Sequence, residues 1–276
     1  MNSIDQIQQI QTAYRRRILD CWDIPPGSRI LEIGCGQGEM TSALAEAVGP
    51  TGHVIAVDIA GRDYGTPLTL GEATDQLKAG EFGDRIDFRF EYDITASEPD
   101  QLYDYAVMVH CSWYFESSDK LRNTLSALTK HAKHLCFAEW DTVPRSQDQI
   151  PHLLAILIQG QVEALKTSSQ SNVRTPFTVS QIKRLLSESG WTFTKGSYPS
   201  TEGLQDSDWE IDECCANSLH QAAALNLSAR HQTLLEGQID LLRQLALPSG
   251  NVPLSSVSFV AERQERVKHT NLYRGC

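Results

Sequence analysis

Hydrophobic residues recur along this chain in two rhythms, as short β-branched runs and as longer stretches with helical spacing. The short runs predict strands over residues 30–33, 53–58, 86–94, 102–110, 135–140, 191–195 and 255–261. Stretches with helical spacing at 41–48, 72–79 and 119–131 lie between runs of this set. Strands that alternate with helices indicate an α/β fold, so we expect a doubly wound sheet within a single domain over residues 1–276.

Three further segments extend beyond this alternation. Apolar residues at helical spacing predict an amphipathic N-terminal helix within residues 1–24. Residues 141–174 contain an apolar helical stretch at 153–165, followed by a polar run, 167–172, that we interpret as a mobile loop. Residues 206–247 carry leucines at helical spacing, enough for two helices. Because an amphipathic helix must bury its apolar stripe, we expect the last two segments to be helical lid insertions over the carboxyl ends of the strands.

Charge and composition restrict the partners of this chain. Its 276 residues carry a net charge of −11, which repels a polyanion and disfavours nucleic acid as a partner. The seven cysteines show no C-x-x-C pair or zinc-like spacing, which fits reduced thiols. The N-terminus lacks the pattern of a signal peptide, and the chain contains no run of about eighteen apolar residues. We therefore expect a cytoplasmic protein without a membrane partner, and the sequence is compatible with a homodimer.

The most informative segment follows the first predicted strand, where the chain has Gly34, Gly36 and Gly38. Glycine permits positive φ angles and removes the Cβ atoms that would keep a ligand away from the backbone. Dinucleotide folds use a related turn, but their third glycine stands one place later, where this chain has Glu39. Since a pyrophosphate would be badly placed beside that carboxylate, the turn favours a cationic cofactor over NAD.

With its flanks, this turn resembles the signature of class I S-adenosylmethionine (SAM)-dependent methyltransferases, in which an acidic residue, here Glu32, opens a G-x-G-x-G loop. Two more carboxylates follow in the family's order. Asp58 closes the second strand, where nucleotide-binding folds hold ribose hydroxyls, and Asp93 follows the third, where the family contacts the adenine amino group. The resemblance covers residues 25–140 and implies a Rossmann-like fold with a seven-stranded, mostly parallel sheet.

The resemblance also implies SAM as the cofactor, S-adenosylhomocysteine (SAH) as the product, and a role for Glu32 in receiving the methionine ammonium. The cofactor-binding residues that it implies are Glu32, Gly34, Cys35, Gly36, Gly38, Asp58, Ile59, Asp93, Ile94 and His110.

The acceptor is expected near the residues that follow the fourth predicted strand. His110 is the candidate catalytic base, because a free imidazole has a pKa of about 6.5 and can accept a proton at neutral pH. A structural histidine that caps the strand fits the sequence equally well. The candidate substrate-binding residues are aromatic and fit either acceptor walls or core packing; they are Tyr14, Tyr64, Trp113, Tyr114 and Trp140.

Three functions compete at this point. The first is methyl transfer to O or N of a small, natural-product-like acceptor by in-line displacement, which depends mainly on alignment of the reacting atoms. The second is a non-catalytic SAM-binding regulator or partner protein, and the third is methylation of a protein side chain. The two helical insertions could cover an acceptor pocket, which favours the small-molecule methyltransferase over the regulator. The negative net charge disfavours a protein methyltransferase. Metal dependence is not expected, because no Asp-Asn pair follows strand five, where catechol-type members place their ligands.

Overall fold

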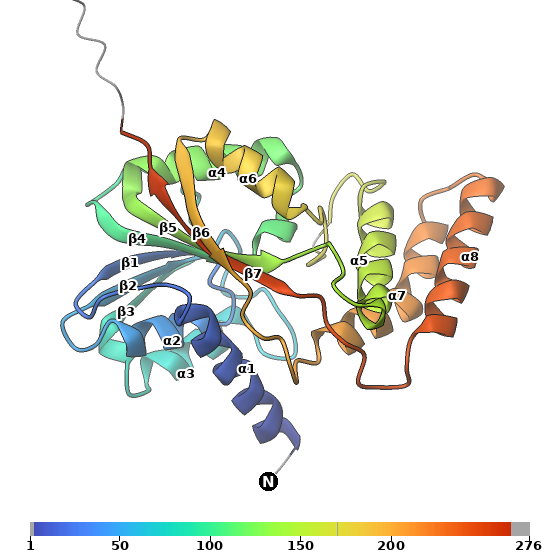
Figure 1. Cartoon of the computed structure of the whole chain (residues 1–276), viewed down its shortest axis with the longest axis horizontal. Coiled ribbons are helices and arrows are strands. Elements are labelled where there is room, and N and C mark those ends of the chain that lie inside the picture. The colour runs from blue at the N-terminus through green and yellow to red at the C-terminus, as the bar shows by residue number, and fades with distance from the viewer. Residues whose placement is uncertain (1–2, 170, 266–276) are drawn as a thin grey trace, which may run out of the picture.

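The computed structural model describes residues 3–169 and 171–265 (Figure 1). The strands are β1 (Arg29–Ile33), β2 (His53–Val57), β3 (Ile86–Arg89), β4 (Tyr103–Val109), β5 (Ala132–Trp140), β6 (Trp191–Ser197) and β7 (Ser256–Arg263). The α-helices are α1 (Ser3–Leu19), α2 (Glu39–Ala47), α3 (Leu70–Lys78), α4 (Ser118–His131), α5 (Ile150–Glu163), α6 (Val179–Glu188), α7 (Asp206–Ala223) and α8 (Ala229–Leu245). Short 3-10 turns cover Gly83–Arg85, Ser112–Tyr114 and Gln147–Gln149.

All the strands join one sheet in the order β3-β2-β1-β4-β5-β7-β6. Strands β1 to β5 are parallel, whereas β7 is antiparallel to both of its neighbours. The prediction of a doubly wound, seven-stranded, mostly parallel sheet is therefore confirmed. In this register Ile33 lies between Val57 and Met108, so the carboxyl ends of β2, β1 and β4 meet at one edge of the sheet.

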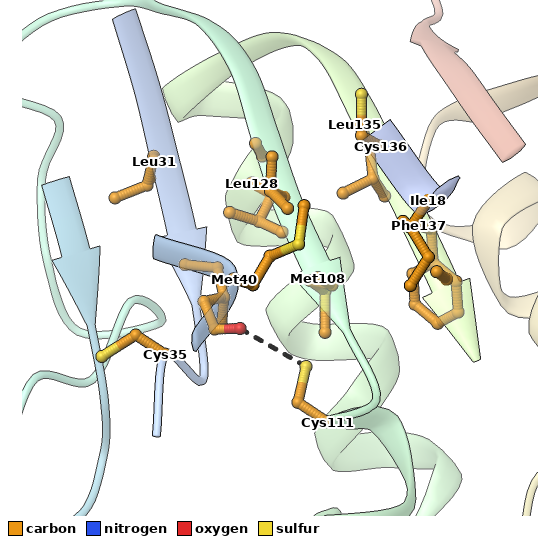
Figure 2. Packing of buried hydrophobic residues seen from close by; sticks show 14 of the residues in the cluster. Ile18, Leu31, Cys35, Met40, Met108, Cys111, Leu128, Leu135, Cys136 and Phe137 are labelled. Atoms are coloured by element: carbon orange, nitrogen blue, oxygen red, sulfur yellow. Dashed lines mark hydrogen bonds between the residues drawn. The ribbon is translucent and has the colours of Figure 1, made fainter. Parts of the chain in front are cut away.

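Helices cover both faces of the sheet, with α1, α2 and α3 on one side and α4 and α6 on the other (Figure 1). The interior is built from apolar side chains of the strands and of the inward helix faces, and Figure 2 shows part of it around β1, β4 and β5. Leu128 of α4 and Ile18 of α1 reach this core from different helices. Burial of such side chains stabilises the fold by about 1.5–3 kcal/mol for each large apolar residue.

Two details differ from the sequence-based prediction. Strand β3 ends at Arg89 and does not reach residue 94, because Glu91 adopts a left-handed backbone (φ 53°) that an extended strand cannot include. The prediction also contained no helix over 179–188, where the structure has α6. Its signal was readable in the sequence, since the Thr178 hydroxyl accepts from the Gln181 backbone N–H and the Gln181 side chain accepts in return, forming a capping box.

Helices α5, α7 and α8 pack against one another beside the sheet (Figure 1). Helix α5 follows β5, α7 follows β6, and α8 precedes the antiparallel β7, so all three connections leave the sheet at its carboxyl edge. The apolar residues between these helices form a second core, which includes Ala155, Ile158, Ile211, Leu235 and Ile239. We call this three-helix unit the bundle. It occupies parts of 141–174 and 206–247, and Gln170, in the polar run expected to be mobile, lies outside the described residues.

Among the described residues, no helix combines the length and the apolar character needed to cross a membrane.

Candidate functional site

The turn between β1 and α2 has left-handed backbone at each of its three glycines, with φ angles of 71°, 53° and 86° at Gly34, Gly36 and Gly38. A Cβ atom on Gly34 would lie 2.8 Å from the Cβ of Cys111, and one on Gly38 would lie 2.4 Å from Leu77 Cδ1. Packing against Cys111 therefore requires glycine at position 34, whereas a Cβ at position 38 would require the Leu77 side chain to move. Within the described part of the chain, a Cβ on Gly36 would meet no atom within 4 Å. The open side of the turn thus lies at Gly36, where a ligand could approach the backbone.

The Asp58 side chain is tied to this turn. Its Oδ2 accepts a hydrogen bond from the Gly36 N–H at 2.9 Å, and its Oδ1 accepts from the Ala60 N–H at 2.9 Å. The next residue, Ile59, leaves 69% of its surface exposed, which is unusual for isoleucine at the end of a buried strand. Asp58 therefore holds the glycine turn and the β2 end together, and Ile59 offers an apolar surface beside them.

Glu32 lies on β1 just before the turn and is 2% exposed. Its Oε2 accepts a hydrogen bond from the Thr41 hydroxyl of α2 at 2.5 Å. Burial raises the pKa of Glu32 to about 8, while the Thr41 hydroxyl and the Arg15 guanidinium oppose part of this shift. A cation bound near this carboxyl would lower its pKa again and favour the charged carboxylate.

The third carboxylate, Asp93, follows β3 and caps its own turn. Its Oδ1 accepts from both the N–H and the hydroxyl of Thr95, and these bonds hold the pKa of Asp93 below its usual value. Ile94 is buried in the main core. The long connection after β2 also reaches the glycine turn, because the Gln37 side chain donates to the Leu68 carbonyl at 2.7 Å.

His110 directly follows β4 and has a left-handed backbone (φ 48°), which is uncommon outside glycine. Its Nδ1 lies 3.1 Å from Glu139 Oε1 on β5, and its Nε2 lies 2.7 Å from the Tyr14 hydroxyl on α1. Three distant segments therefore place their side chains in one row. We call Tyr14, His110 and Glu139 the relay.

The hydrogen bonds around Glu139 fix the direction of this relay. Its Oε1 also accepts from the Trp140 N–H, and its Oε2 accepts from the N–H and the hydroxyl of Ser112. Surrounded by donors, the carboxylate acts only as an acceptor, so His110 Nδ1 must carry a proton. In a neutral imidazole Nε2 is then the acceptor, and the Tyr14 hydroxyl donates to it.

Aromatic packing supports the same row. The Trp140 ring lies 4.6 Å from the His110 ring and is stacked 6.3 Å from the Tyr14 ring, as measured between centroids. Tyr14 is almost completely buried, which raises its phenol pKa despite the opposing effects of Ser256 and Arg15. The phenol therefore stays protonated and keeps its hydrogen bond to His110.

Comparison with known proteins identifies the family. A model of the methyltransferase domain matches residues 7–195, which is more than half of the chain and includes the glycine turn, Asp58 and the relay. The chain belongs to the class I SAM-dependent methyltransferases. The crystal structure of a cyclopropane-fatty-acyl-phospholipid synthase-like protein from Lactobacillus casei is similar to this methyltransferase, with 35% identity, coverage of 93% of this chain and 92% of that one, and a TM-score of 0.84.

Two curated relatives are similar over shorter regions. A methyltransferase of Diaporthe leptostromiformis is 27% identical over 208 residues, covering 60% of this chain and 54% of that protein. The demethylmenaquinone methyltransferase of Bacillus cereus is 33% identical over 110 residues, covering 39% of this chain and 42% of that enzyme. The matched parts thus span about half the length of these curated relatives.

Sequence reasoning missed Glu139, although a readable signal was present. Glu139 interrupts the apolar run of β5, just as Glu32 interrupts that of β1, and a carboxylate in a buried strand needs a polar partner. What the sequence could not supply was the partner, because His110 and Tyr14 approach Glu139 only through the pairing of β4 with β5 and the position of α1.

The remaining aromatic candidates divide into buried and exposed residues. Trp113 is buried, and its indole N–H donates to the Phe177 carbonyl at 3.3 Å, so its ring anchors the chain that follows the polar run. Tyr114 is 39% exposed. Removal of water from around its hydroxyl raises the pKa of Tyr114, and Tyr64 and Glu210 of α7 raise it further. Tyr114, Tyr64 and Glu210 therefore bring three segments together between the sheet edge and the bundle.

Proposed function

We propose that this methyltransferase binds SAM at the glycine turn and transfers its methyl group to O or N of a small-molecule acceptor. The observation that carries the proposal is the relay, which ends beside the turn at the carboxyl edge of the sheet. In doubly wound folds, ligands bind at this edge, near the point where strand order reverses. Here that point lies between β1, which carries Glu32, and β4, which is directly followed by His110.

The residues present fit the cofactor. Gly36 leaves open space beside the backbone, Asp58 offers carboxylate oxygens for ribose hydroxyls, and Ile59 offers an apolar surface for a purine. Glu32 is a buried carboxyl that a cationic ammonium would favour in its charged form. When bound, SAM supplies a methyl group on a positively charged sulfur. Cys35, Asp93 and Ile94 complete the proposed cofactor contacts.

The relay gives this chain a way to accept a proton. A phenol or an amine must lose a proton as it is methylated, whereas a carboxylate at neutral pH need not. We propose that His110 Nε2 takes this proton, with Glu139 holding the imidazole in the required tautomer. In the structure the Tyr14 hydroxyl is hydrogen-bonded to Nε2. The acceptor therefore either displaces the phenol from Nε2, or gives its proton to the phenol oxygen while the phenol proton moves to Nε2.

The bundle and α1 are proposed to close over the acceptor. Gln11 of α1 donates to Asp206 of α7 at 3.1 Å, so α1 connects the core to the bundle on the side of the relay. The proposed walls of the acceptor site are Tyr64, Tyr114 and Trp140. Trp113 is buried and has a packing role. Relatives named nocamycin O-methyltransferase and demethylmenaquinone methyltransferase support an acceptor of small size. A cytoplasmic location is part of this proposal.

Two alternatives remain as test outcomes. A non-catalytic regulator would bind SAM and SAH without methylating any acceptor, and a protein methyltransferase would modify polypeptides but no small molecule. The relay favours an enzyme over a regulator, because the buried Glu139 orients a histidine whose side chain is still 13% exposed, at the edge of the sheet where ligands bind.

The test is incubation with SAM and a panel of phenols, amines and carboxylic acids, read as the mass gain of one methyl group. We expect His110→Gln to reduce methylation of phenols or amines by about 10²-fold or more and to leave that of carboxylic acids largely unchanged. His53→Gln, a change on β2 at the opposite edge of the sheet, is the matched control. Calorimetry should show heat with SAH and none with NAD. No mass gain on any small acceptor, or comparable NAD binding, would contradict the proposal.

A further inference from the structure

The outer surface of the bundle carries an apolar face that the fold leaves uncovered. Five leucines there are each about half exposed, at 45–53% of their surface; they are Leu157 and Leu165 from the α5 region and Leu234, Leu241 and Leu245 from α8. Soluble monomers rarely expose contiguous apolar patches of several hundred Å², and such patches mark interaction sites. We call these five residues the leucine face.

Helix α8 has two separate apolar stripes. Leu235, Ile239 and Leu242 point into the bundle and are buried. Leu234, Leu241 and Leu245 recur at helical spacing one position away and point outward. A helix that is apolar on two sides is expected to be covered on both.

The two helices that carry the leucine face lie side by side. The Gln238 side chain of α8 donates to Gln161, which lies between Leu157 and Leu165 in sequence, at 3.5 Å. Helix α5 leads away from the sheet and α8 returns to it, so the helices run antiparallel (Figure 1). The Oε1 atom of Gln238 is buried and has no hydrogen-bond partner among the described residues. The contact between Gln238 and Gln161 joins the exposed leucines of the two helices into one face.

Gly237 gives the face its shape. It lies inside α8, where glycine costs about 1 kcal/mol of helix stability relative to alanine. A Cβ added there would meet no atom of the described residues within 4 Å, so no packing that the structure describes requires glycine at this position. With Arg230, Thr233, Leu234, Gln238 and Leu241 it lines an open groove of about 600 Å³. Small residues at a helix surface permit another helix to approach closely.

We propose that the leucine face is the interface of a homodimer, with α8 of two copies packed antiparallel and crossing at Gly237. A two-fold axis at this position places residues at equal distances before and after Gly237 opposite each other. Arg230 then faces the last turns of the second α8 and lies within one helical turn of its Asp240. This charge pair forms twice across the axis, so the face is complementary to itself. The proposal is independent of which acceptor is methylated.

Sedimentation velocity of the full chain, over a concentration series in the micromolar range, tests the proposal. We expect a monomer–dimer equilibrium in the unmodified protein. The double variant Leu234→Gln, Leu241→Gln should be monomeric over the series, with unchanged circular dichroism and unchanged heat of SAH binding. Leu102→Gln is the matched control, because Leu102 is 42% exposed before β4, at the opposite edge of the sheet. A monomer at every concentration, or a dimer unaffected by the double variant, would overturn the proposal.

Gly237→Ala separates the interface from folding. Alanine favours the helix, so the melting temperature of the dissociated protein should rise. The added methyl groups should push the two helices apart and weaken dimerisation by about tenfold or more. Gly237→Cys tests the crossing point, since thiols at a two-fold axis should form a disulfide between copies on mild oxidation. Glu236→Cys, turned about 100° away on the same helix, should not. Equal dimerisation of Gly237→Ala and the unmodified protein, or equal cross-linking of the two cysteine variants, would contradict this arrangement.

Discussion

Asp58 connects the end of β2 to the glycine turn through two backbone N–H groups. We predict that Asp58→Ala lowers affinity for SAH by roughly 1.5–3 kcal/mol, the usual contribution of charge-assisted hydrogen bonds. Titration calorimetry measures the change. The melting temperature should be recorded in parallel, because loss of the Gly36 hydrogen bond also loosens the turn. An unchanged affinity would mean that the ribose does not bind at this strand end.

Glu32 makes stability depend on pH in a predictable direction. Its pKa rises from an ordinary 4.5 to about 8 on folding, because burial disfavours the carboxylate. The folded state therefore binds the proton more tightly than the unfolded chain does, and stability is lost as pH rises from about 4.5 to about 8. Each pKa unit corresponds to about 1.4 kcal/mol. We predict that the free energy of unfolding of Glu32→Gln falls less steeply over this window, as measured by urea denaturation.

The same carboxyl should couple cofactor binding to proton release. If a cationic ammonium lies near Glu32, SAH binding at pH 7 releases a proton from the protein. The heat of binding should then differ between buffers of different ionisation enthalpy, and the difference should be smaller for Glu32→Gln. Identical proton release in both proteins would assign the proton to another group.

Among the structural elements, the turn that leads into α2 contains two glycines with different roles, Gly36 and Gly38. Gly36→Ala and Gly38→Ala both force alanine into a left-handed backbone, at a cost of about 1–2 kcal/mol. Only at Gly38 does the new Cβ also collide with Leu77 of α3. We therefore predict a larger fall in melting temperature for Gly38→Ala. Gly36→Ala should instead weaken SAH binding more strongly, because its Cβ enters the open side of the turn. The ratio of lost SAH affinity to lost melting temperature should therefore be larger for Gly36→Ala than for Gly38→Ala. Equal ratios in the two variants would show that the open side is not the cofactor site.

In the molecule as a whole, Trp140 links the relay to the bundle, because its ring contacts His110 and also lies edge-on to His152 of α5. Arg174 N–H and Thr175 N–H both donate to the Trp113 carbonyl, so the chain after α5 is anchored next to the turn that follows β4. We predict that hydrogen exchange within residues 167–172 slows when SAH and an acceptor bind together, as expected of a lid segment. Mass spectrometry of the peptide measures it, with a peptide from α6 as the control. Exchange that is unchanged by both ligands would remove the lid from the proposal.

Local sequence patterns were enough to predict the alternation of strands and helices up to β5 and the glycine turn after β1. Apolar periodicity and glycine spacing are local properties, so the strands, Gly34, Gly36 and Gly38, and the carboxylate that closes β2 could be found from neighbours in the chain. The boundaries moved by a few residues where local backbone intervened, as at Glu91. Helix α6 also has a local signal, the capping box formed by Thr178 and Gln181.

Which side chains come into contact depends on the folding of the whole chain. Tyr14, His110 and Glu139 are separated by 96 and 29 positions, and their hydrogen bonds depend on strand register and on the packing of α1. Whether Trp113 is a wall or a core residue, and which leucines of α8 stay exposed, likewise depends on segments distant in sequence. Periodicity gives a helix an apolar side, but the surface that covers this side is fixed by the whole chain, because burial depends on what lies nearby in space.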